Sequence, residues 1–343
     1  MTADASHRRR VSLADVAKEA GVSTSAASFA LNGRSGVSEP VRARVKMAAE
    51  ALGYVPWTSG VALRTGRSGA VALLIRNMRN PFVLDVINGF DATCATAGLG
   101  VIIGSADYSS DREKQLLSTF IAREADGLAL APIGGGDSAM RWQKMTGKPL
   151  VLINAAKHAP AVAASRVHVD SEDAVRQAVD HLLSLGHRRI ALVAAPHDRS
   201  ADDERVETFH EAVGRHRFEG RIIETEMQHD RAAEVMAGVL REEPATRPTA
   251  FITNSDYIAS ALYFAAAQAG VRVGDDISVV GHDDLSTSRL LSPALSTIAV
   301  DRFEIGVAAA TLLIQQLDGG DPETVVAPAA LVPRQSSGRP RTP

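Results

Sequence analysis

The chain of 343 residues has one cysteine, Cys94, and only 4% aromatic residues. One cysteine allows no internal disulfide and no cysteine-based zinc site, so Cys94 is expected to be a small core residue. No apolar run approaches the ~20 residues of a membrane span, and no apolar signal core follows the basic start. These absences predict a cytoplasmic location and no membrane partner.

Motifs of several enzyme classes are also missing. The sequence has no Walker phosphate loop, no Gly-x-Ser-x-Gly and no His-Glu-x-x-His. His210-Glu211 is followed by His216, a spacing that does not place two zinc ligands on one helix face. We therefore expect no catalytic residues, no metal and no cofactor, and we expect that the protein is not an enzyme. An enzyme is still the first rival interpretation, because doubly wound sheets host many reactions.

Charge is distributed unevenly along the chain. Residues 1–68 hold ten Lys or Arg against five Asp or Glu, whereas residues 69–343 hold 27 against 35. A basic segment on a chain with net charge −3 indicates contact with phosphates, whose neutralisation gives salt-dependent affinity. The basic residues 1–10 are expected to be a disordered tail, with or without a role in this contact.

The segment 11–56 has the pattern of three short helices. Ser12 is expected to cap a helix that starts at Leu13, and Gly21 supplies the turn after it. A second helix, about 24–31, follows Ser23 as its N-cap and is expected to bury Ala27 and Leu31. Two helices at this spacing form a helix-turn-helix, which is a DNA-binding motif.

The outer face of the second helix carries Thr24, Ser25, Ser28 and Phe29. A third helix begins at Ser38-Glu39-Pro40, which combines a cap, an acid in the first turn and an early proline. Its inward residues include Val45, and Gly53 ends it. The segment therefore predicts an all-α domain.

After Gly69 the pattern changes to alternating strands and helices. Continuous apolar runs of this kind are typical of parallel strands buried on both faces, so we expect an α/β fold of two doubly wound lobes. The runs lie at 70–75, 100–104, 127–131, 150–154, 190–194, 250–253 and 277–281.

An ordered set of motifs along the chain resembles the lactose-repressor (LacI/GalR) family of bacterial transcription regulators. The resemblance implies an operator-binding regulator, in the first place a repressor, that acts at the nucleoid in the cytoplasm and has a periplasmic-binding-protein-like domain. The motifs are Asp15-Val16-Ala17-Lys18, Ala20-Gly21-Val22-Ser23, Leu31-Asn32-Gly33, Val37-Ser38, Leu52-Gly53-Tyr54-Val55-Pro56 and Leu63-Arg64-Thr65-Gly66.

The same resemblance implies the domain boundaries. A DNA-binding domain is expected over 11–56, a hinge over 57–68 and an effector-binding and dimerisation domain over 69–335. Its first lobe spans about 69–168 and 299–328, and its second about 169–298 and 329–335. The polar tail 336–343 has no leucine heptad, so we expect a disordered tail and a homodimer rather than a tetramer built by that tail.

Residue by residue, the resemblance places Thr24, Ser25 and Phe29 toward the bases of duplex DNA, with Ser28 and Asn32 on phosphates. Phenylalanine cannot hydrogen-bond a base, so Phe29 is expected to pack on a thymine methyl; the other interpretation is a plain exposed aromatic. A twofold dimer implies an inverted-repeat operator. Further DNA contacts are implied for Ser12, Ser23 and Tyr54, and Leu63 matches the leucine that wedges into the minor groove.

Polar residues after the strands are the candidates for binding an effector. Asn80 and Phe82 match the family's Asn-Pro-Phe motif, Arg205 matches its effector-binding arginine, and Asp283 matches its effector-binding aspartate. Arginine and an acid facing each other across a cleft suit the hydroxyls of a sugar; the other interpretation is an ion pair between the lobes. Strand-end position alone adds Asn154, Ser255 and Asp256.

The class of effector is left open by one departure from the family pattern. Met227 stands where many members have an aromatic residue that stacks on the ligand. A sugar is the first expectation, and a nucleobase or another non-sugar effector is the alternative. A secreted solute-binding protein is another rival interpretation, because it would share the two-lobed domain. It would, however, need an export signal and would lack the DNA-binding helices.

Overall fold

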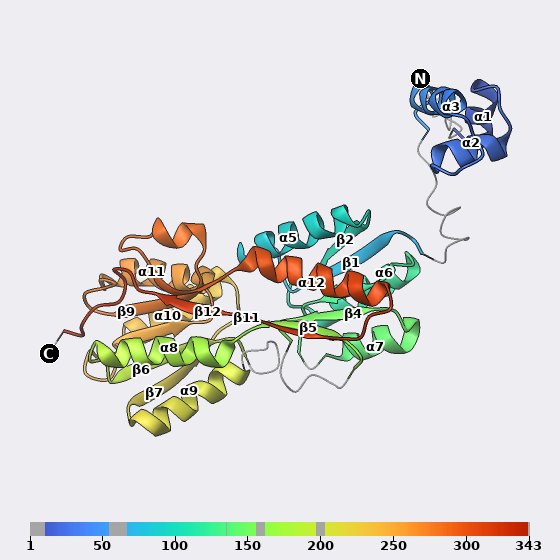
Figure 1. Cartoon of the computed structure of the whole chain (residues 1–343). Helices are drawn as coiled ribbons and strands as arrows, with labels where there is room; N and C mark the ends of the chain where they lie inside the picture. Colours follow the sequence, from blue (N-terminus) through green and yellow to red (C-terminus); the bar gives the residue numbers. More distant parts are fainter. Residues whose placement is uncertain (1–10, 55–66, 135, 156–161, 197–202, 342–343) are drawn as a thin grey trace, which may run out of the picture. The chain divides into compact units, whose positions relative to one another are not determined.

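The computed structural model describes residues 11–54, 67–134, 136–155, 162–196 and 203–341 (Figure 1). The chain divides into two compact units, Met1–Ser68 and Gly69–Pro343, each of which is described by itself. The basic residues 1–10 and the hinge leucine Leu63 lie outside the described residues. Within the described part, no helix is long and apolar enough to span a membrane.

The first unit holds three helices, α1 (Leu13–Glu19), α2 (Thr24–Leu31) and α3 (Glu39–Ala51). The capping box is present at α1, where the Asp15 amide donates to Ser12 Oγ and the Ser12 amide donates to the Asp15 carboxylate. The helices bury mostly small side chains, so they pack closely. The buried set is Val16, Ala17, Ala20, Ala27, Ala30, Val45, Ala48 and Ala49.

One expectation for this core needs correction. Ala30 is fully buried, whereas Leu31 is only partly buried at the edge of the cluster. The reason is that Ala27 and Ala30 are three residues apart and share the inward face of α2, which leaves Leu31 beside it.

The first lobe of the second unit is a six-stranded sheet with helices on both faces. Its strands are all parallel, in the order β11-β5-β4-β3-β1-β2. The strands are β1 (Ala70–Ile75), β2 (Gly100–Ser105), β3 (Leu128–Leu130), β4 (Leu150–Ile153), β5 (Ser165–Val169) and β11 (Thr324–Ala327). The helices are α5 (Phe82–Thr96), α6 (Ser110–Ala122), α7 (Asp137–Thr146) and α12 (Arg302–Leu317).

Successive residues of β1 explain the two layers of helices. Val71 and Leu73 belong to a buried cluster with residues of α5 and α12, whereas Ala72 and Leu74 belong to a cluster with residues of α6 and α7. Alternate side chains of a strand point to opposite faces of the sheet, so an uninterrupted apolar run requires cover on both. Cys94 lies in the first cluster as a core residue, and burial raises the pKa of its thiol to about 12, so it is a neutral thiol.

The second lobe repeats this architecture in the order β12-β10-β9-β8-β6-β7, with β12 antiparallel to β10 and the other pairs parallel. The strands are β6 (Arg189–Ala194), β7 (Glu219–Glu224), β8 (Ala250–Thr253), β9 (Ser278–Asp283), β10 (Ser296–Val300) and β12 (Ala329–Val332). The helices are α8 (Ser171–Ser184), α9 (Asp203–His216), α10 (His229–Leu240), α11 (Asp256–Ala269) and the short 3-10 helix η1 (Ser286–Arg289).

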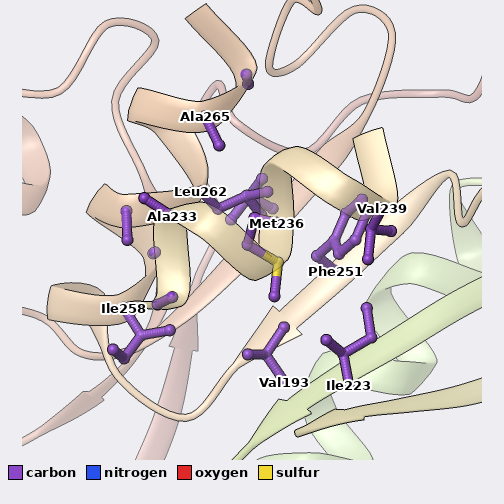
Figure 2. Close-up of a cluster of buried hydrophobic side chains, with 14 of the residues drawn as sticks. Val193, Ile223, Ala233, Met236, Val239, Phe251, Ile258, Leu262 and Ala265 are labelled. Atoms are coloured by element: carbon purple, nitrogen blue, oxygen red, sulfur yellow. The ribbon is translucent and has the colours of Figure 1, made fainter. Parts of the chain in front are cut away.

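The core on one face of this second sheet lies beneath α10 and α11. Figure 2 shows Met236 and Leu262 from these helices above Val193 and Ile223 from the strands, with Phe251 of β8 beside Val239. Each large side chain buried in this way contributes about 1.5–3 kcal/mol. The cluster therefore fixes α11, whose first residues lie beside the carboxyl ends of β8 and β9.

All seven strands predicted from apolar runs are present, but five further strands are missing from the prediction. The missed strands are β5, β7, β10, β11 and β12. They lie at or next to the edges of the sheets. Polar residues interrupt β5, β7 and the start of β10, whereas β11 and β12 are short, with four residues each. The chain passes between the sheets after Val169, after Val300 and at Pro328, close to the passages near 168, 298 and 328 that the family resemblance implies.

The expectation of a disordered tail is wrong for residues 336–341. Ser336 is fully buried; its hydroxyl accepts from the Ser296 amide at 2.7 Å and donates to the Val279 carbonyl at 2.6 Å. The Gly338 carbonyl lies 2.9 Å from Nε2 of the buried His187. A polar segment was expected to prefer water, but here it supplies the hydrogen-bond partners of buried polar groups in the second lobe.

Helices α5 and α12 lie against each other through two glycines, which gives a first testable prediction. A Cβ atom on Gly306 would overlap the Val86 carbonyl oxygen, and one on Gly89 would overlap the Phe303 carbonyl oxygen. We expect Gly306→Ala to lower the free energy of unfolding by about 1–3 kcal/mol, because backbone rather than a flexible side chain must move. Chemical denaturation measures this change.

The matched control is Gly238→Ala. Gly238 lies in α10 with no atom within 4 Å of an added Cβ atom, so alanine there is expected to stabilise by up to ~1 kcal/mol through helix propensity. Equal effects of the two substitutions would contradict the close helix contact.

Candidate functional site

The strand order of the two sheets locates the site. Strand β1 has β2 on one side and β3 on the other, and β6 likewise lies between β7 and β8, so each sheet has a switch point at the carboxyl end of its strands. Ligands of open α/β sheets bind at such points. Arg76 directly follows β1, Asn254 directly follows β8, and Asp283 ends β9.

A cavity of about 590 Å³, including space open to solvent, lies at these strand ends and is lined by residues of both lobes. Two neighbouring cavities of about 550 and 540 Å³ share Arg76, Tyr108 and Asn154 with it, so the three form one cleft. The lining of the main cavity is Arg76, Asn80, Phe82, Tyr108, Asn154, Val169, Arg205, Met227, Asn254, Ser255, Tyr257, Ile258, His282 and Asp283.

Six of the seven residues predicted to bind an effector line this cavity. From the first lobe come Asn80, Phe82 and Asn154, and from the second come Arg205, Ser255 and Asp283. Three of these side chains accept hydrogen bonds from nearby backbone amides, which fixes the local backbone conformation. Asn80 Oδ1 accepts from the Phe82 amide at 3.0 Å, and Asn154 Oδ1 accepts from the Val169 amide at 3.1 Å. Ser255 is the N-cap of α11, with Oγ accepting from the Ile258 amide at 3.2 Å.

The seventh residue, Asp256, does not line the cavity. Its carboxylate, only 3% exposed, accepts hydrogen bonds from the Leu285 amide at 2.9 Å, from Ser288 Oγ at 2.5 Å and from Thr297 Oγ1 at 2.6 Å. Its acceptor oxygens are therefore committed to the segment after β9. The expectation that Asp256 contacts the ligand is therefore wrong. Its carboxylate instead holds the segment that follows Asp283.

Burial, followed by the negative charge of Asp283, raises the pKa of Asp256 to about 7. Because this folded-state pKa exceeds the unfolded value of about 3.9, protonation favours the fold. The stabilisation from Asp256 is present below about pH 4 and is lost as the pH rises through about 7, on the order of 4 kcal/mol in total. We expect Asp256→Asn to remove most of this pH dependence.

Urea denaturation at several pH values measures this effect, with Asp301→Asn as the control. Asp301 is exposed and caps α12, so its replacement leaves the pH dependence between pH 5 and about 8 in place. Parallel pH profiles for the wild type and Asp256→Asn would contradict the raised pKa.

The Arg205 side chain reaches the strand ends from α9. Its Nη1 donates to the Asn254 carbonyl at 2.9 Å, its Nη2 lies 3.4 Å from Nε2 of His282, and its Nε lies 3.5 Å from Ser171 Oγ. Nδ1 of His282 lies 3.1 Å from Asp283 Oδ1. The cationic and anionic groups of the second lobe are thus linked through one imidazole.

The backbone at Asp283 is in an unusual conformation. Its φ is +114° and that of Asp284 is +50°, which side chains with a Cβ atom rarely adopt. Arg302 helps to hold this conformation, since its Nη1 donates to the carbonyls of both residues. Such a backbone costs of order 1–3 kcal/mol and is found at binding sites, where it fixes a side chain in one direction.

Sequence reasoning missed several residues of the cleft. Arg76 and Asn254 stand directly after strands, so the rule that selected Asn154 would also have selected them. Arg76 donates through Nε to the Pro132 carbonyl at 3.0 Å, and Asn254 Nδ2 donates to the sulfur of Met227 at 2.7 Å. The rings of Tyr108 and Tyr257 come from loop and helix positions that no periodicity marks. Among the described residues, no group of three or more His, Cys, Asp or Glu is able to hold a metal.

The residues predicted to face DNA bases lie on one helix of the first unit. Thr24 and Ser25 are the first residues of α2 and are exposed, and Phe29 is 38% exposed on the same helix. The Arg34 guanidinium lies 5.9 Å from the centre of the Phe29 ring. Arg42 donates to the Ala30 carbonyl at 3.0 Å and to the Arg34 carbonyl at 2.9 Å, which ties α3 to the end of α2.

The other predicted DNA contacts have local structural roles as well. Ser12 and Ser23 cap α1 and α2, so their hydroxyls lie at helix N-termini, where backbone amides favour anions. Asn32 Nδ2 donates to the Ser28 carbonyl at 2.8 Å, which closes the end of α2. Tyr54 packs partly against the three-helix core.

Comparison with known proteins separates the same two units. Residues 12–56 match the lacI family of bacterial regulatory proteins, and residues 179–337 match the periplasmic binding protein-like domain. The transcriptional repressor CytR of Escherichia coli (strain K12) is 29% identical over 308 residues, which cover 89% of each chain. Other similar proteins are also transcriptional repressors rather than enzymes.

Two solved structures extend this likeness to the whole fold. The lac repressor dimer bound to operator and the anti-inducer ONPF matches with a TM-score of 0.85 and 25% identity, over 96% of this chain and 100% of that chain. The complex of the transcriptional regulator CelR with cellobiose matches with a TM-score of 0.71 and 26% identity, over 95% and 100%.

Helix α2, with exposed Thr24 and Ser25, belongs to a capped three-helix unit, and the cleft lies at the strand ends of two doubly wound sheets. Both features fall within the regions that the family models and the repressor structures match. The chain therefore belongs to the lacI family of bacterial transcription regulators.

Proposed function

We propose that the protein is a transcriptional repressor that binds an inverted-repeat operator as a homodimer and is switched by a small hydroxylated effector, most simply a sugar. The observation that carries this proposal is the cleft, in which Asn80 and Phe82 of one lobe and Arg205 and Asp283 of the other line one cavity. Repressors among the similar proteins support the DNA-binding half of the proposal.

The chemistry of the cleft favours hydroxyl groups. A guanidinium donates hydrogen bonds and a carboxylate accepts them, so neighbouring hydroxyls of one ligand satisfy both Arg205 and Asp283. Amide side chains of Asn80, Asn154 and Asn254 add donors and acceptors to the lining. The cellobiose bound by CelR supports the choice of a sugar.

A nucleobase is the second candidate, because aromatic rings also line the cavity. Phe82, Tyr108 and Tyr257 supply flat apolar surface, while the asparagines match the edges of a heterocyclic base. Met227 stands among these rings and is 8% exposed, so it offers a soft apolar contact rather than an aromatic stack.

Lobe closure is the proposed switch. Because the cleft has one wall on each lobe, a ligand that contacts both favours the closed arrangement by its difference in affinity for the two arrangements. The three passages after Val169, after Val300 and at Pro328 are the only covalent links between the lobes in the described chain. Closure would change the spacing of the two DNA-reading units in a dimer and hence the affinity for the operator.

Exposed apolar side chains support the dimer. Leu84 of α5 is 51% exposed and Phe303 of α12 is 44% exposed; in the second lobe, Phe264 of α11 is 52% exposed. Large apolar groups that gather on helix faces mark association surfaces. The dimeric state of the lac repressor structure agrees with this proposal.

The test of the proposed function combines a ligand screen with DNA binding. Thermal unfolding is followed with D-ribose, D-glucose, cellobiose, adenine and adenosine, and each compound that raises the midpoint is added to an operator-binding assay. A sugar that both stabilises the protein and changes operator affinity supports the proposal. If adenine alone acts, the nucleobase candidate replaces the sugar, and if operator binding fails at moderate salt with every compound, the proposal is wrong.

Phe29 provides a prediction for the DNA-reading helix. We expect Phe29→Ala to weaken the preference for one base pair in each half-site by about 1–3 kcal/mol, roughly 5- to 150-fold, because the contact of the ring with a thymine methyl is lost. Sequencing of duplexes selected from a random pool measures the preference. Met47→Ala is the control, since Met47 is 69% exposed on α3 rather than on α2. An unaltered preference in Phe29→Ala would exclude base contact by this ring.

A further inference from the structure

His282 lies between the two charged groups of the effector cleft. It belongs to β9, is only 5% exposed, and lines the main cavity. Its Nε2 is 3.4 Å from Nη2 of Arg205, and its Nδ1 is 3.1 Å from Oδ1 of Asp283. The imidazole therefore contacts both groups that were expected to bind the effector.

The chemistry of these contacts selects one form of the imidazole. A guanidinium has only N–H donors, so Nε2 of His282 must accept from Arg205 and carry no hydrogen. The ring hydrogen is then on Nδ1, from which it is donated to the Asp283 carboxylate. The opposite tautomer would place an N–H against an N–H and a lone pair against a carboxylate. A doubly protonated ring would place a second cation against Arg205.

Both ends of this bridge are held by other elements. Arg205 also donates through Nη1 to the Asn254 carbonyl after β8, and its Nε faces Ser171 at the start of α8. At the other end, Arg302 of α12 donates to the Asp283 carbonyl and holds the unusual backbone there. Residues after β8, at the start of α8 and in α12 thus hold the two groups that the nitrogens of His282 contact.

We propose that His282 is a positioning residue of the effector site. As a neutral imidazole protonated on Nδ1, it holds the Arg205 guanidinium and the Asp283 carboxylate in one arrangement that reads two adjacent hydroxyls of a ligand. One hydroxyl accepts from Arg205 and its neighbour donates to Asp283. This inference rests on the proposed effector site and narrows its ligand to compounds with a vicinal diol.

Other side chains would not serve this role in the same space. A phenylalanine ring fills the volume, but it neither accepts from Arg205 nor donates to Asp283. Glutamine keeps an acceptor at the end of its side chain, near the place of Nε2, so it retains the contact with Arg205. His282→Phe and His282→Gln therefore form a matched pair that separates volume from hydrogen bonding.

Nuclear magnetic resonance of the ligand-free full chain tests the bridge. Spectra that correlate ring nitrogens with ring protons identify the tautomer at about pH 8, above the usual imidazole pKa of about 6.5. We expect the Nδ1–H tautomer for His282. For Arg205, whose guanidinium is restrained, we expect separate signals from its individual N–H groups. The His282 signals are assigned by their loss in His282→Phe, and the Arg205 signals by their loss in Arg205→Met. The arginine signals should merge by rotation in His282→Phe and stay resolved in His282→Gln. An Nε2–H tautomer, or arginine signals that are identical in all variants, would overturn the bridge.

The vicinal diol is tested with ligands that lack one hydroxyl, namely D-ribose against 2-deoxy- and 3-deoxy-D-ribose, D-glucose against 2-deoxy- and 3-deoxy-D-glucose, and adenosine against 2′-deoxyadenosine. Every pair of adjacent ring hydroxyls loses a member in one of these deoxy compounds. For at least one parent compound, calorimetry should give at least about tenfold weaker binding of a deoxy compound, because one hydrogen bond to a charged group is lost. In His282→Phe, the ratio of the two dissociation constants should approach one. Equal binding of every parent and all its deoxy compounds, or binding of none of them, would overturn the diol class.

The two measurements distinguish this inference from the proposed function. If the Nδ1–H tautomer and the restrained arginine are found but no hydroxylated ligand binds, the proposed effector is wrong while the bridge stands. If a sugar binds and changes operator affinity but His282 has the other tautomer, the proposed function stands and the positioning role of His282 is wrong.

Discussion

A chain that ends at Gln335 is expected to unfold about 10–20 °C below the full chain. Removing the last residues takes away Ser336, whose hydroxyl and backbone pair with the Ser296 amide, the Val279 carbonyl and the Val279 amide. It also removes the Gly338 carbonyl from His187, which is 1% exposed. Buried groups that lose their partners cost about 1–3 kcal/mol each, so the loss is on the order of 5 kcal/mol. In domains of about this size each kcal/mol lowers the midpoint by ~2–4 °C.

The control is a chain that ends at Arg339, which keeps the bonds of Ser336 and Gly338. It loses the ion pairs of Arg341 with Asp275 and Asp276, in which the arginine is 57% exposed, so its midpoint should lie close to that of the full chain. Scanning calorimetry compares the three chains. Equal midpoints for the chains ending at Gln335 and Arg339 would show that the buried hydrogen bonds of this segment do not stabilise the fold.

The second large effect is expected at Arg205. Arg205→Met should weaken binding of the effector found in the ligand screen by about 100-fold or more, while operator affinity without effector stays unchanged. Each hydrogen bond from a charged group contributes about 1.5–3 kcal/mol, so the loss of two such bonds from the guanidinium to the ligand corresponds to roughly 100-fold or more in affinity. The expected phenotype is a repressor whose operator affinity no longer responds to the ligand.

Arg189→Met is the matched control. Like Arg205, Arg189 donates to backbone carbonyls, those of Arg247 at 2.9 Å and Pro244 at 3.1 Å, but it does not line the cleft. Calorimetry with the effector and an operator-binding titration compare the two variants. If both lose effector affinity equally, the effect comes from general damage to the second lobe, and if neither does, Arg205 is not an effector contact.

Local sequence patterns determine the central strands and the helix starts of this protein. Central strands such as β1 and β8 were predictable because burial on both faces demands an unbroken apolar run, and helix starts at Ser12 and Ser23 were predictable because caps are local. The edge strand β7 was not predictable, since the charged residues Glu219, Arg221 and Glu224 interrupt its apolar run, which an edge strand tolerates.

The site was predictable where a strand end or a family motif marked it, as at Asn80, Arg205 and Asp283. The misplacement of Asp256 has a physical cause: it adjoins the cap Ser255, but its carboxylate turns toward Ser288 and Thr297, which are far away in the sequence. The same long-range pairing explains the error for the tail, where Ser336 meets Ser296. Hydrogen bonds between distant polar residues leave no periodic signal in a sequence.

The most direct test of the central claim is selection of duplexes from a random pool by the purified full chain, with and without the sugar that stabilises it. The account predicts enrichment of an inverted repeat with two half-sites and a change in the bound fraction when the sugar is added. Recovery of unrelated sequences with no twofold symmetry, under both conditions, would contradict it.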